Sequence, residues 1–559
     1  MHPRRWLLGT RKIAKISFLG VLVSALSAQV AVDRGRGFGF PEDWTHHRIK
    51  FNSAMLHQHP EIAVREPRAA IQLYKEAVAQ SKPRLLNPPT APDFTAPAPH
   101  ADWSIGLGTG RIAPGMYPAK WNSDPTLPIT SANCNTDFVI YGLNVAGTGS
   151  QAGMIAFYNL YSGATGTPLC TGGQPKVLFS YNTSTVTNGL IRTSPVLSSD
   201  GKKVGFIETT INNPKTTIFH VLTIPAIGSN GTSATAPVAP PSGAMTSLTI
   251  VANSDTRSSP WIDYGSDSAY VAADDGKLYK IHPVFTGTPA LVTTAPWPIT
   301  IKLNSVFTSP VLDVNGDIYL GAGNGNLYTL NVNSTTTPPI TIHAVGSGTP
   351  NPGVLDSPLL DSGNSVFAIS SNDANTSKSA VVVQMATTTL SEKARINIGT
   401  GSNGGTTVNL YDGDFDNNFT TPGSGHLFVC GTATGSTIPA TYMLPFNASG
   451  NLGSATGNTV ATNAAARCGP VTEFFNQNIG TGGTDFFFWS VSRNCNDGTN
   501  GCVLSLANGA NGPNSPQEFG GASGIIVDNN STSGQAHSIY FSTEGSPLNA
   551  VKLTQDLLN

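Results

Sequence analysis

Two stretches of this chain repeat each other, and this repeat constrains the fold more than any other feature. Each begins with a Ser-Pro dipeptide, at Ser259-Pro260 and at Ser309-Pro310, followed by two apolar residues and an aspartate. Further on, residues 270–281 and 319–330 align without a gap and share Tyr, Ala, Gly, Leu and Tyr at equivalent places. Each piece reads as a strand, a tight turn closed by Asp-Gly or Asn-Gly, and a second strand. The repeating unit is therefore a small antiparallel sheet.

Related starts recur along the chain at a regular spacing. They lie at or near Cys134, Ser194-Pro195, Ser357-Pro358, Tyr411, Gly469-Pro470 and Ser523-Gly524. Starts about 48–65 residues apart are typical of four-stranded propeller blades. A single blade cannot bury both of its faces, whereas a closed ring of blades covers them. We therefore expect an all-β fold: a β-propeller over residues 103–559, with eight four-stranded blades and seven as the alternative.

A propeller makes a specific demand on the repeated strands. Successive strand residues point to opposite faces of a sheet. The adjacent pairs Leu278-Tyr279 and Leu327-Tyr328 should therefore both be buried, because blades stack on both faces. Gly276 and Gly325 close the turns and are expected to have positive φ.

The motif Ser-Pro-apolar-apolar-Asp, followed by Tyr and then by Asp/Asn-Gly-x-Leu-Tyr, resembles the repeat of the quinoprotein-type (PQQ-like repeat) β-propeller superfamily. The resemblance is specific over residues 258–282 and 308–332, weaker over 193–225 and 357–390, and slight elsewhere. Some members are pyrroloquinoline-quinone alcohol dehydrogenases and others are non-catalytic scaffolds. The chain lacks the adjacent Cys-Cys pair that covers one face of the quinone in those enzymes, and it lacks a haem motif. The resemblance thus implies the fold of an exported, non-catalytic bacterial member, without a cofactor.

The first 27 residues have the pattern of a secretory signal peptide. Five basic residues precede an apolar stretch from Ile16 to Leu26, and small residues follow it. This stretch is short for a bilayer crossing. We expect cleavage after Ser27, no membrane span afterwards, and a periplasmic, cell-surface or extracellular location. An uncleaved signal anchor is the alternative.

Residues 28–82 are interpreted as an N-terminal extension and residues 83–102 as a proline-rich linker. The extension has one expected helix, with Pro67 in its first turn. It also holds four histidines, which could bind Zn²⁺ or Cu²⁺ but whose role the sequence leaves open: His46, His47, His57 and His59.

The net charge and the cysteine content limit which classes of partner, and which bonds between cysteines, are expected. Cleavage after Ser27 leaves 26 Lys and Arg against 33 Asp and Glu. Nucleic acid is therefore not an expected partner, because it binds basic surfaces. Six cysteines in an exported chain predict three disulfides, for which 15 pairings exist. Sequence proximity favours Cys134–Cys170 and Cys495–Cys502, which leaves Cys430–Cys468.

Two groups of residues are candidate binding sites. Asp412, Asp414 and Asp416 have the alternating spacing with which loops converge oxygens on Ca²⁺, although a solvated turn is the alternative. Arg192 and Arg257 precede Ser-Pro starts in equivalent places and could approach the channel mouth. There they would pair with a carboxylate or an acidic ligand, or bind carbonyls between blades.

No catalytic constellation can be recognised in the sequence. There is no Gly-x-Ser-x-Gly elbow and no phosphate loop. We expect an exported module that binds a partner protein or a glycan at the cell surface or in the periplasm. A quinoprotein-like oxidoreductase and a glycan-cleaving propeller enzyme are the alternatives, and fold alone does not decide among them.

Overall fold

The computed structural model describes residues 39–73, 100–123, 132–163, 168–210, 212, 214–348, 353–362, 364–402, 406–419, 423–462, 465–476, 483–495, 500–507, 510–511, 518, 520–529, 535 and 537–554. The expected signal peptide and residues 83–99 of the expected linker lie outside the described residues. None of the helices in the described ranges is both long and apolar enough to span a membrane.

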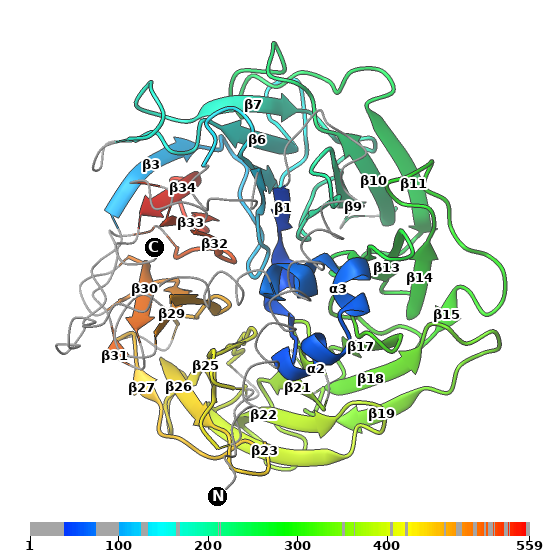
Figure 1. The fold of residues 1–559 in the computed structure, drawn as a ribbon, viewed down its shortest axis with the longest axis vertical. Coiled ribbons are helices and arrows are strands. Elements are labelled where there is room, and N and C mark those ends of the chain that lie inside the picture. Colours follow the sequence, from blue (N-terminus) through cyan, green and yellow to red (C-terminus); the bar gives the residue numbers. More distant parts are fainter. Residues whose placement is uncertain are drawn as a thin grey trace, which may run out of the picture.

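Eight antiparallel sheets surround a central axis, and the chain visits them in order (Figure 1). The chain is an eight-bladed β-propeller. Its eight blades confirm the preferred number from the repeat spacing. In each blade the strands are given from the innermost to the outermost.

Blade 1 contains β4 (Ala119–Ser123), β5 (Phe138–Gly142), β6 (Met154–Tyr158) and β7 (Lys176–Tyr181). Blade 2 contains β8 (Val196–Leu197), β9 (Lys203–Thr210), β10 (Thr216–Thr223) and β11 (Met245–Ala252). Blade 3 contains β12 (Trp261–Asp263), β13 (Ser268–Ala272), β14 (Lys277–Ile281) and β15 (Ile299–Thr300). Blade 4 contains β16 (Val311–Leu312), β17 (Asp317–Gly321), β18 (Asn326–Asn331) and β19 (Thr341–Ala344).

Blade 5 contains β20 (Leu359–Asp361), β21 (Ser365–Ser370), β22 (Ser379–Ala386) and β23 (Glu392–Thr400). Blade 6 contains β24 (Asp414–Phe415), β25 (His426–Thr432), β26 (Pro439–Pro445) and β27 (Asn458–Thr459). Blade 7 contains β28 (Thr472–Asn476), β29 (Thr484–Val491), β30 (Cys502–Ala507) and β31 (Ala510–Asn511). Blade 8 contains β32 (Ile526–Asn529), β33 (His537–Ser542), β34 (Asn549–Thr554) and β3 (His100–Gly106).

The ring is closed by the start of the propeller chain. Strand β3 pairs antiparallel with β34, so the first and last strands of the propeller lie in one blade (Figure 1). Two fully buried ion pairs reinforce the closure, one inside blade 8 and one between blades 8 and 1. Lys552 Nζ lies 2.8 Å from Asp102 Oδ2, and Lys120 Nζ lies 2.9 Å from Asp528 Oδ2. The propeller thus begins at His100, inside the range expected to be linker.

The repeated strands are buried on both faces, as the propeller requires. Leu278 and Leu327 are 0% exposed, and the tyrosines that follow them, Tyr279 and Tyr328, are 6% and 1% exposed. Gly276 has φ +90°, and a Cβ there would lie 2.1 Å from the Lys302 carbonyl oxygen. These turns therefore need glycine both for conformation and for space.

The Ser-Pro motif joins neighbouring blades. The Tyr117 N–H donates to Ser194 Oγ (2.9 Å), the Ser194 N–H to Ser259 Oγ (2.8 Å), and the Ser259 N–H to Ser309 Oγ (2.7 Å). Each of these three motif serines thus accepts a hydrogen bond from the preceding blade. Blade 1 begins at Tyr117-Pro118, which corrects the start expected near Cys134. The repeat does not reveal this start, because tyrosine stands where blades 2–5 have serine.

The three expected disulfides are all present. They join Cys134 to Cys170, Cys430 to Cys468, and Cys495 to Cys502. The second joins blade 6 to the start of blade 7, and the other two each lie within one blade.

Residues 39–73, called the N-terminal segment below, lie at the centre of the ring (Figure 1). This segment contains β1 (Gly39–Glu42), the 3-10 helix η1 (Trp44–His47), β2 (Ile49–Lys50), α2 (Ser53–Gln58) and α3 (Glu61–Arg65). A further helical stretch covers residues 67–73, so Pro67 begins it as expected. The remainder of that expected helix lies outside the described residues.

Candidate functional site

The central channel is occupied by the protein's own N-terminal segment. Strand β1 pairs antiparallel with β4 of blade 1, and β2 pairs in parallel with β20 of blade 5. Blades 1 and 5 are opposite each other in a ring of eight, so the segment crosses the channel (Figure 1). We call the side with the connections between blades the upper face and the opposite side the lower face. Gly39 lies beside Ser123 at the lower end of β4, so the segment enters from the lower face.

After the turn at η1, the segment returns to the lower face along blade 5. The Leu360 N–H donates to the Arg48 carbonyl (2.8 Å), and the Ser362 N–H donates to the Lys50 carbonyl (3.0 Å). Helix α2 follows, with the Asn52 side chain accepting a hydrogen bond from the Met55 N–H at its start (3.0 Å).

Residues 48–51 alternate charged and apolar side chains, as a strand with two different faces does. Ile49 and Phe51 are 7% and 1% exposed and belong to the largest apolar core. Trp44 of the same segment packs edge-on against Trp261 of blade 3, with 5.7 Å between ring centroids. One side of the segment is therefore built into the propeller core, while Arg48 and Lys50 reach carboxylates.

Arg48 is the most enclosed of these cations, with 1% of its side chain exposed. Its guanidinium lies 3.3 Å from Asp356 Oδ2 and also contacts the Asp412 carboxylate. It lies over the rings of Trp44 and Tyr117, 5.9 and 5.5 Å from their centroids. Burial raises the pKa of Asp356, and Arg48 acts against that rise. Arg48 thus compensates two carboxylates from two blades.

Lys50 contacts a carboxylate of a third blade, blade 7. Its Nζ lies 3.3 Å from Glu473 Oε2. Burial alone would lower the pKa of Lys50, but Glu473, Asp414 and Asp485 together raise it. Burial raises the pKa of Glu473 well above its usual range, and Lys50 opposes this rise. The lysine is therefore held in its charged form by a group of carboxylates.

The four histidines of the segment do not share one site. His47 Nδ1 lies 3.5 Å from Asp414 Oδ2, and its ring stacks on Tyr117 at 5.5 Å. His57 and His59 are exposed at the lower face, where His59 Nδ1 contacts Glu61 (3.1 Å). Within the described ranges, no three or more His, Cys, Asp or Glu side chains are grouped as they would be around a metal ion.

The aspartates singled out for Ca²⁺ each contact a different arginine or histidine side chain of the protein. Asp412 contacts Arg48, Asp414 contacts His47, and Asp416 accepts from His426 Nδ1 at 2.8 Å. Their alternating spacing places them on one side of an extended segment. The structure therefore does not bring the three carboxylates together around one point.

The two candidate arginines lie on the upper face at blades 2 and 3. Arg192 Nη2 lies 2.5 Å from Asp255 Oδ2, and Arg192 Nε donates to the Thr256 carbonyl at 3.4 Å. It therefore combines both roles considered from the sequence, a carboxylate and a carbonyl of the next blade. Arg257 is exposed. Burial, and to a smaller extent the charge of Arg257, lower the pKa of Arg192, while Asp255 acts against this lowering.

The upper face near Arg192 and Arg257 also carries an acidic side chain and exposed apolar side chains. Burial, and next the charge of Asp255, raise the pKa of Asp274 to about 6, against the effect of Arg192 and Arg257. Leu303 lies beside the turn at Gly276 and is 60% exposed, and Val306 is 36% exposed. We call Arg192, Arg257, Asp274, Leu303 and Val306 the loop-face patch.

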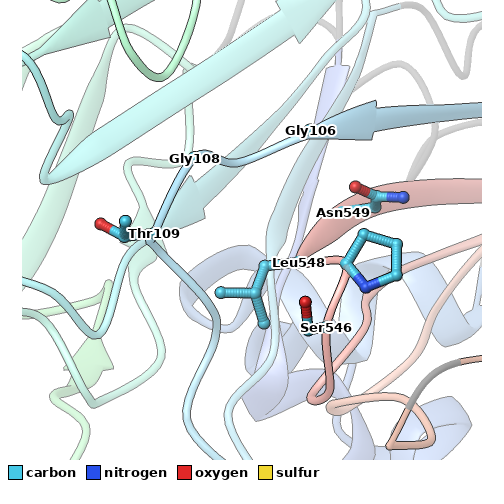
Figure 2. Close-up of a pocket in the computed structure, with 7 residues that line it drawn as sticks. Gly106, Gly108, Thr109, Ser546, Leu548 and Asn549 are labelled. Atoms are coloured by element: carbon cyan, nitrogen blue, oxygen red, sulfur yellow. The ribbon is translucent and has the colours of Figure 1, made fainter.

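A shallow hollow lies at the upper face of blade 8, between the end of β3 and the turn that joins β33 to β34 (Figure 2). Its volume is about 530 Å³, and its lining has no ionisable side chain. The lining residues are Gly106, Gly108, Thr109, Ser546, Pro547, Leu548 and Asn549.

The sequence reasoning did not identify the channel residues Arg48, Lys50, Asp356 and Glu473. The alternation over residues 48–51 could have indicated a short strand with one charged face. Nothing local indicates its partners, because Arg48 and Asp356 are 308 positions apart.

Neither a protein-family model nor a curated protein matches the chain. Solved structures similar to it include BamB from Moraxella catarrhalis, with 14% identity and a TM-score of 0.40 over 82% of this chain and 98% of that chain. The WD40 domain of Toxoplasma gondii coronin has 11% identity and a TM-score of 0.37 over 83% and 89%. Sqt1 from Chaetomium thermophilum has 8% identity and a TM-score of 0.41 over 83% and 98%. Values this low carry no argument about function, and the eight-blade assignment rests on the strand pairing of this chain.

Proposed function

We propose that this protein is an exported scaffold that binds a protein or glycan partner through the upper face of its propeller. The observation that carries the proposal is the occupied channel. The N-terminal segment fills the axis and places Arg48 and Lys50 against the channel carboxylates. While the segment is in place, recognition is directed to the outer surfaces, where a rigid ring presents loops.

The loop-face patch is the part of that surface best suited to a partner. It combines exposed apolar side chains with a guanidinium, and such combinations are enriched in protein interfaces. Arg257 is exposed and available for a carboxylate or a carbohydrate hydroxyl. Export is supported by three disulfides, which persist in oxidising compartments, and by the pattern of residues 1–27.

The test uses the protein from residue 28 onward. The protein serves as bait for the periplasmic and cell-surface fractions of the producing cells, and it is also applied to a glycan array. We expect Arg257→Glu and Leu303→Glu to weaken the captured interaction at least about tenfold, the loss expected when an interface residue worth about 1.4 kcal/mol is removed. Matched controls on the lower face are Arg65→Glu and Val314→Glu, both at exposed positions. Equal weakening by the controls, or undiminished binding by both upper-face variants, would exclude this surface.

A further inference from the structure

We propose that the channel contains a peptide-binding site for an extended segment that alternates basic and apolar residues, and that residues 43–51 occupy it as a built-in ligand. The site is the acidic wall, defined as Asp356, Asp412, Asp414, Glu473 and Asp485. It is separate from the loop-face patch, so either proposal can fail without the other. Its ligand in trans would be such a segment of a partner protein.

The acidic wall comes from three successive blades, and the basic side chains that contact it come from the N-terminal segment. Arg48 contacts Asp356 and Asp412, His47 contacts Asp414, and Lys50 contacts Glu473. Burial raises the pKa of Asp356, Glu473 and Asp485. Without a cation, these carboxylates would repel one another in a poorly solvated channel. The wall therefore selects a basic ligand.

The backbone of blade 5 supplies recognition that does not depend on side chains. Strand β2 adds to β20 in parallel, through the hydrogen bonds from Leu360 and Ser362 to the Arg48 and Lys50 carbonyls. In this mode of peptide binding, main-chain bonds set the register and alternate side chains give selectivity. The register places Arg48 and Lys50 toward the wall and Ile49 toward the apolar core.

The chain joins the segment to the propeller through residues 74–99, which separate it from β3. A ligand tethered to its own site competes at a high effective concentration. An identical peptide added from outside therefore competes poorly with the segment while the chain is intact. Cutting the connection should remove this advantage and make the site measurable in trans.

The experiment starts from the full-length protein with a site-specific protease sequence placed between residues 74 and 99. After folding and cutting, we expect the N-terminal fragment to stay bound. We also expect a fluorescent peptide copying residues 39–52 to exchange into the site. The peptide should bind the uncut protein at least about tenfold more weakly, because the tethered segment competes. Binding should weaken as salt is raised, because ion pairs contribute to it.

Three matched comparisons test the charges of the peptide, the charges of the wall and the order of residues in the peptide. A peptide carrying Arg48→Glu and Lys50→Glu should lose at least about tenfold in affinity, as should wild-type peptide tested on cut protein carrying Asp412→Asn and Glu473→Gln. A scrambled peptide of the same composition keeps the charge but loses the alternation, and it should bind at least about tenfold more weakly.

Three results would overturn the proposal. One is equal binding by the scrambled peptide. Another is release of the fragment on cutting, with no rebinding at millimolar peptide. The third is loss of the near-UV circular dichroism of the propeller when the fragment exchanges, which would make the segment an inseparable part of the core.

Discussion

The pairs Leu278-Tyr279 and Leu327-Tyr328 show what a residue in the third strand of a blade must do. Both members of each pair are buried although they point in opposite directions, because a neighbouring blade covers each face. The Tyr279 hydroxyl donates to Asp275 Oδ2 at 2.7 Å, and the Asn324 amide donates to the Tyr328 hydroxyl at 2.7 Å. Each tyrosine thus keeps a polar partner at the edge of its apolar surface.

We expect Leu278→Ala and Leu327→Ala each to lower the free energy of unfolding by about 2–5 kcal/mol, the cost of a cavity in a packed core. Chemical denaturation monitored by tryptophan fluorescence measures it. The control is Ile342→Ala on β19, where the side chain is 55% exposed, and its effect should stay within about 0.5 kcal/mol. A neutral leucine variant would contradict the two-sided packing of that blade.

The titration of the single residue Asp274 leads to a prediction about how stability depends on pH. Burial raises its pKa from 3.8 to about 6, so the folded state binds this proton more tightly than the unfolded state. The stability from this group is fully present below about pH 4 and is lost as the pH rises through about 6.

The variant Asp274→Asn cannot undergo this loss. Relative to wild type, its free energy of unfolding should increase between pH 4 and pH 8 by about 1 kcal/mol, a value discounted because the side chain is partly exposed. Denaturation curves at several pH values measure the difference. A difference that does not change with pH would show that Asp274 titrates alike in both states.

At the scale of elements, the N-terminal segment and the propeller depend on each other. The strands of the N-terminal segment, β1 and β2, are short, with four and two residues. They pair with the innermost strands of blades 1 and 5. Strands this short do not hold by backbone pairing alone. Packing of Trp44 and Phe51 in the core and ion pairing of Arg48 supply the rest.

Removal of the Arg48 side chain tests this dependence. Arg48→Ala leaves Asp356 and Asp412 without their buried cation, and we expect it to cost about 3–5 kcal/mol of unfolding free energy. Arg65→Ala removes an exposed arginine from the same segment and should change stability by less than about 0.5 kcal/mol. Similar effects of the two substitutions in urea denaturation would argue against a buried ionic contact in the channel.

For the whole molecule, ring closure and disulfides resist opening of the circle. Strand β3 completes blade 8 beside β34, and a disulfide joins Cys430 of blade 6 to Cys468 before blade 7. A closed ring leaves no blade without a neighbour, so local unfolding of one blade exposes the faces of two others.

The disulfides should differ in what they contribute. Cys134–Cys170 spans 36 positions and Cys495–Cys502 spans 7. Loop-closure entropy predicts about 4 kcal/mol for the first and about 2.5 kcal/mol for the second. Paired Cys→Ala variants should therefore lower the unfolding midpoint more for the longer loop. The reverse order would mean that native contacts near Cys495, not chain entropy, decide the effect.

The sequence alone determined the parts of this protein that depend on local signals. Alternating strands recur along the propeller, and Ser-Pro starts or related ones recur at blade spacing, with turn glycines such as Gly276 and Gly325 in the clearest repeats. The blade and the number of blades could therefore be predicted. The disulfide pairing followed from proximity for the same reason. The alternating aspartates Asp412, Asp414 and Asp416 were recognised as a group, but their partners were not.

Tertiary structure alone decided what fills the channel. The contacts of Arg48 with Asp356 and Asp412 and of Lys50 with Glu473 join residues more than 300 positions apart. No local pattern specifies such a pairing. The same is true of ring closure, where Asp102 meets Lys552. The channel charges are buried because the N-terminal segment occupies the axis of the ring and places Arg48 and Lys50 against the carboxylates there.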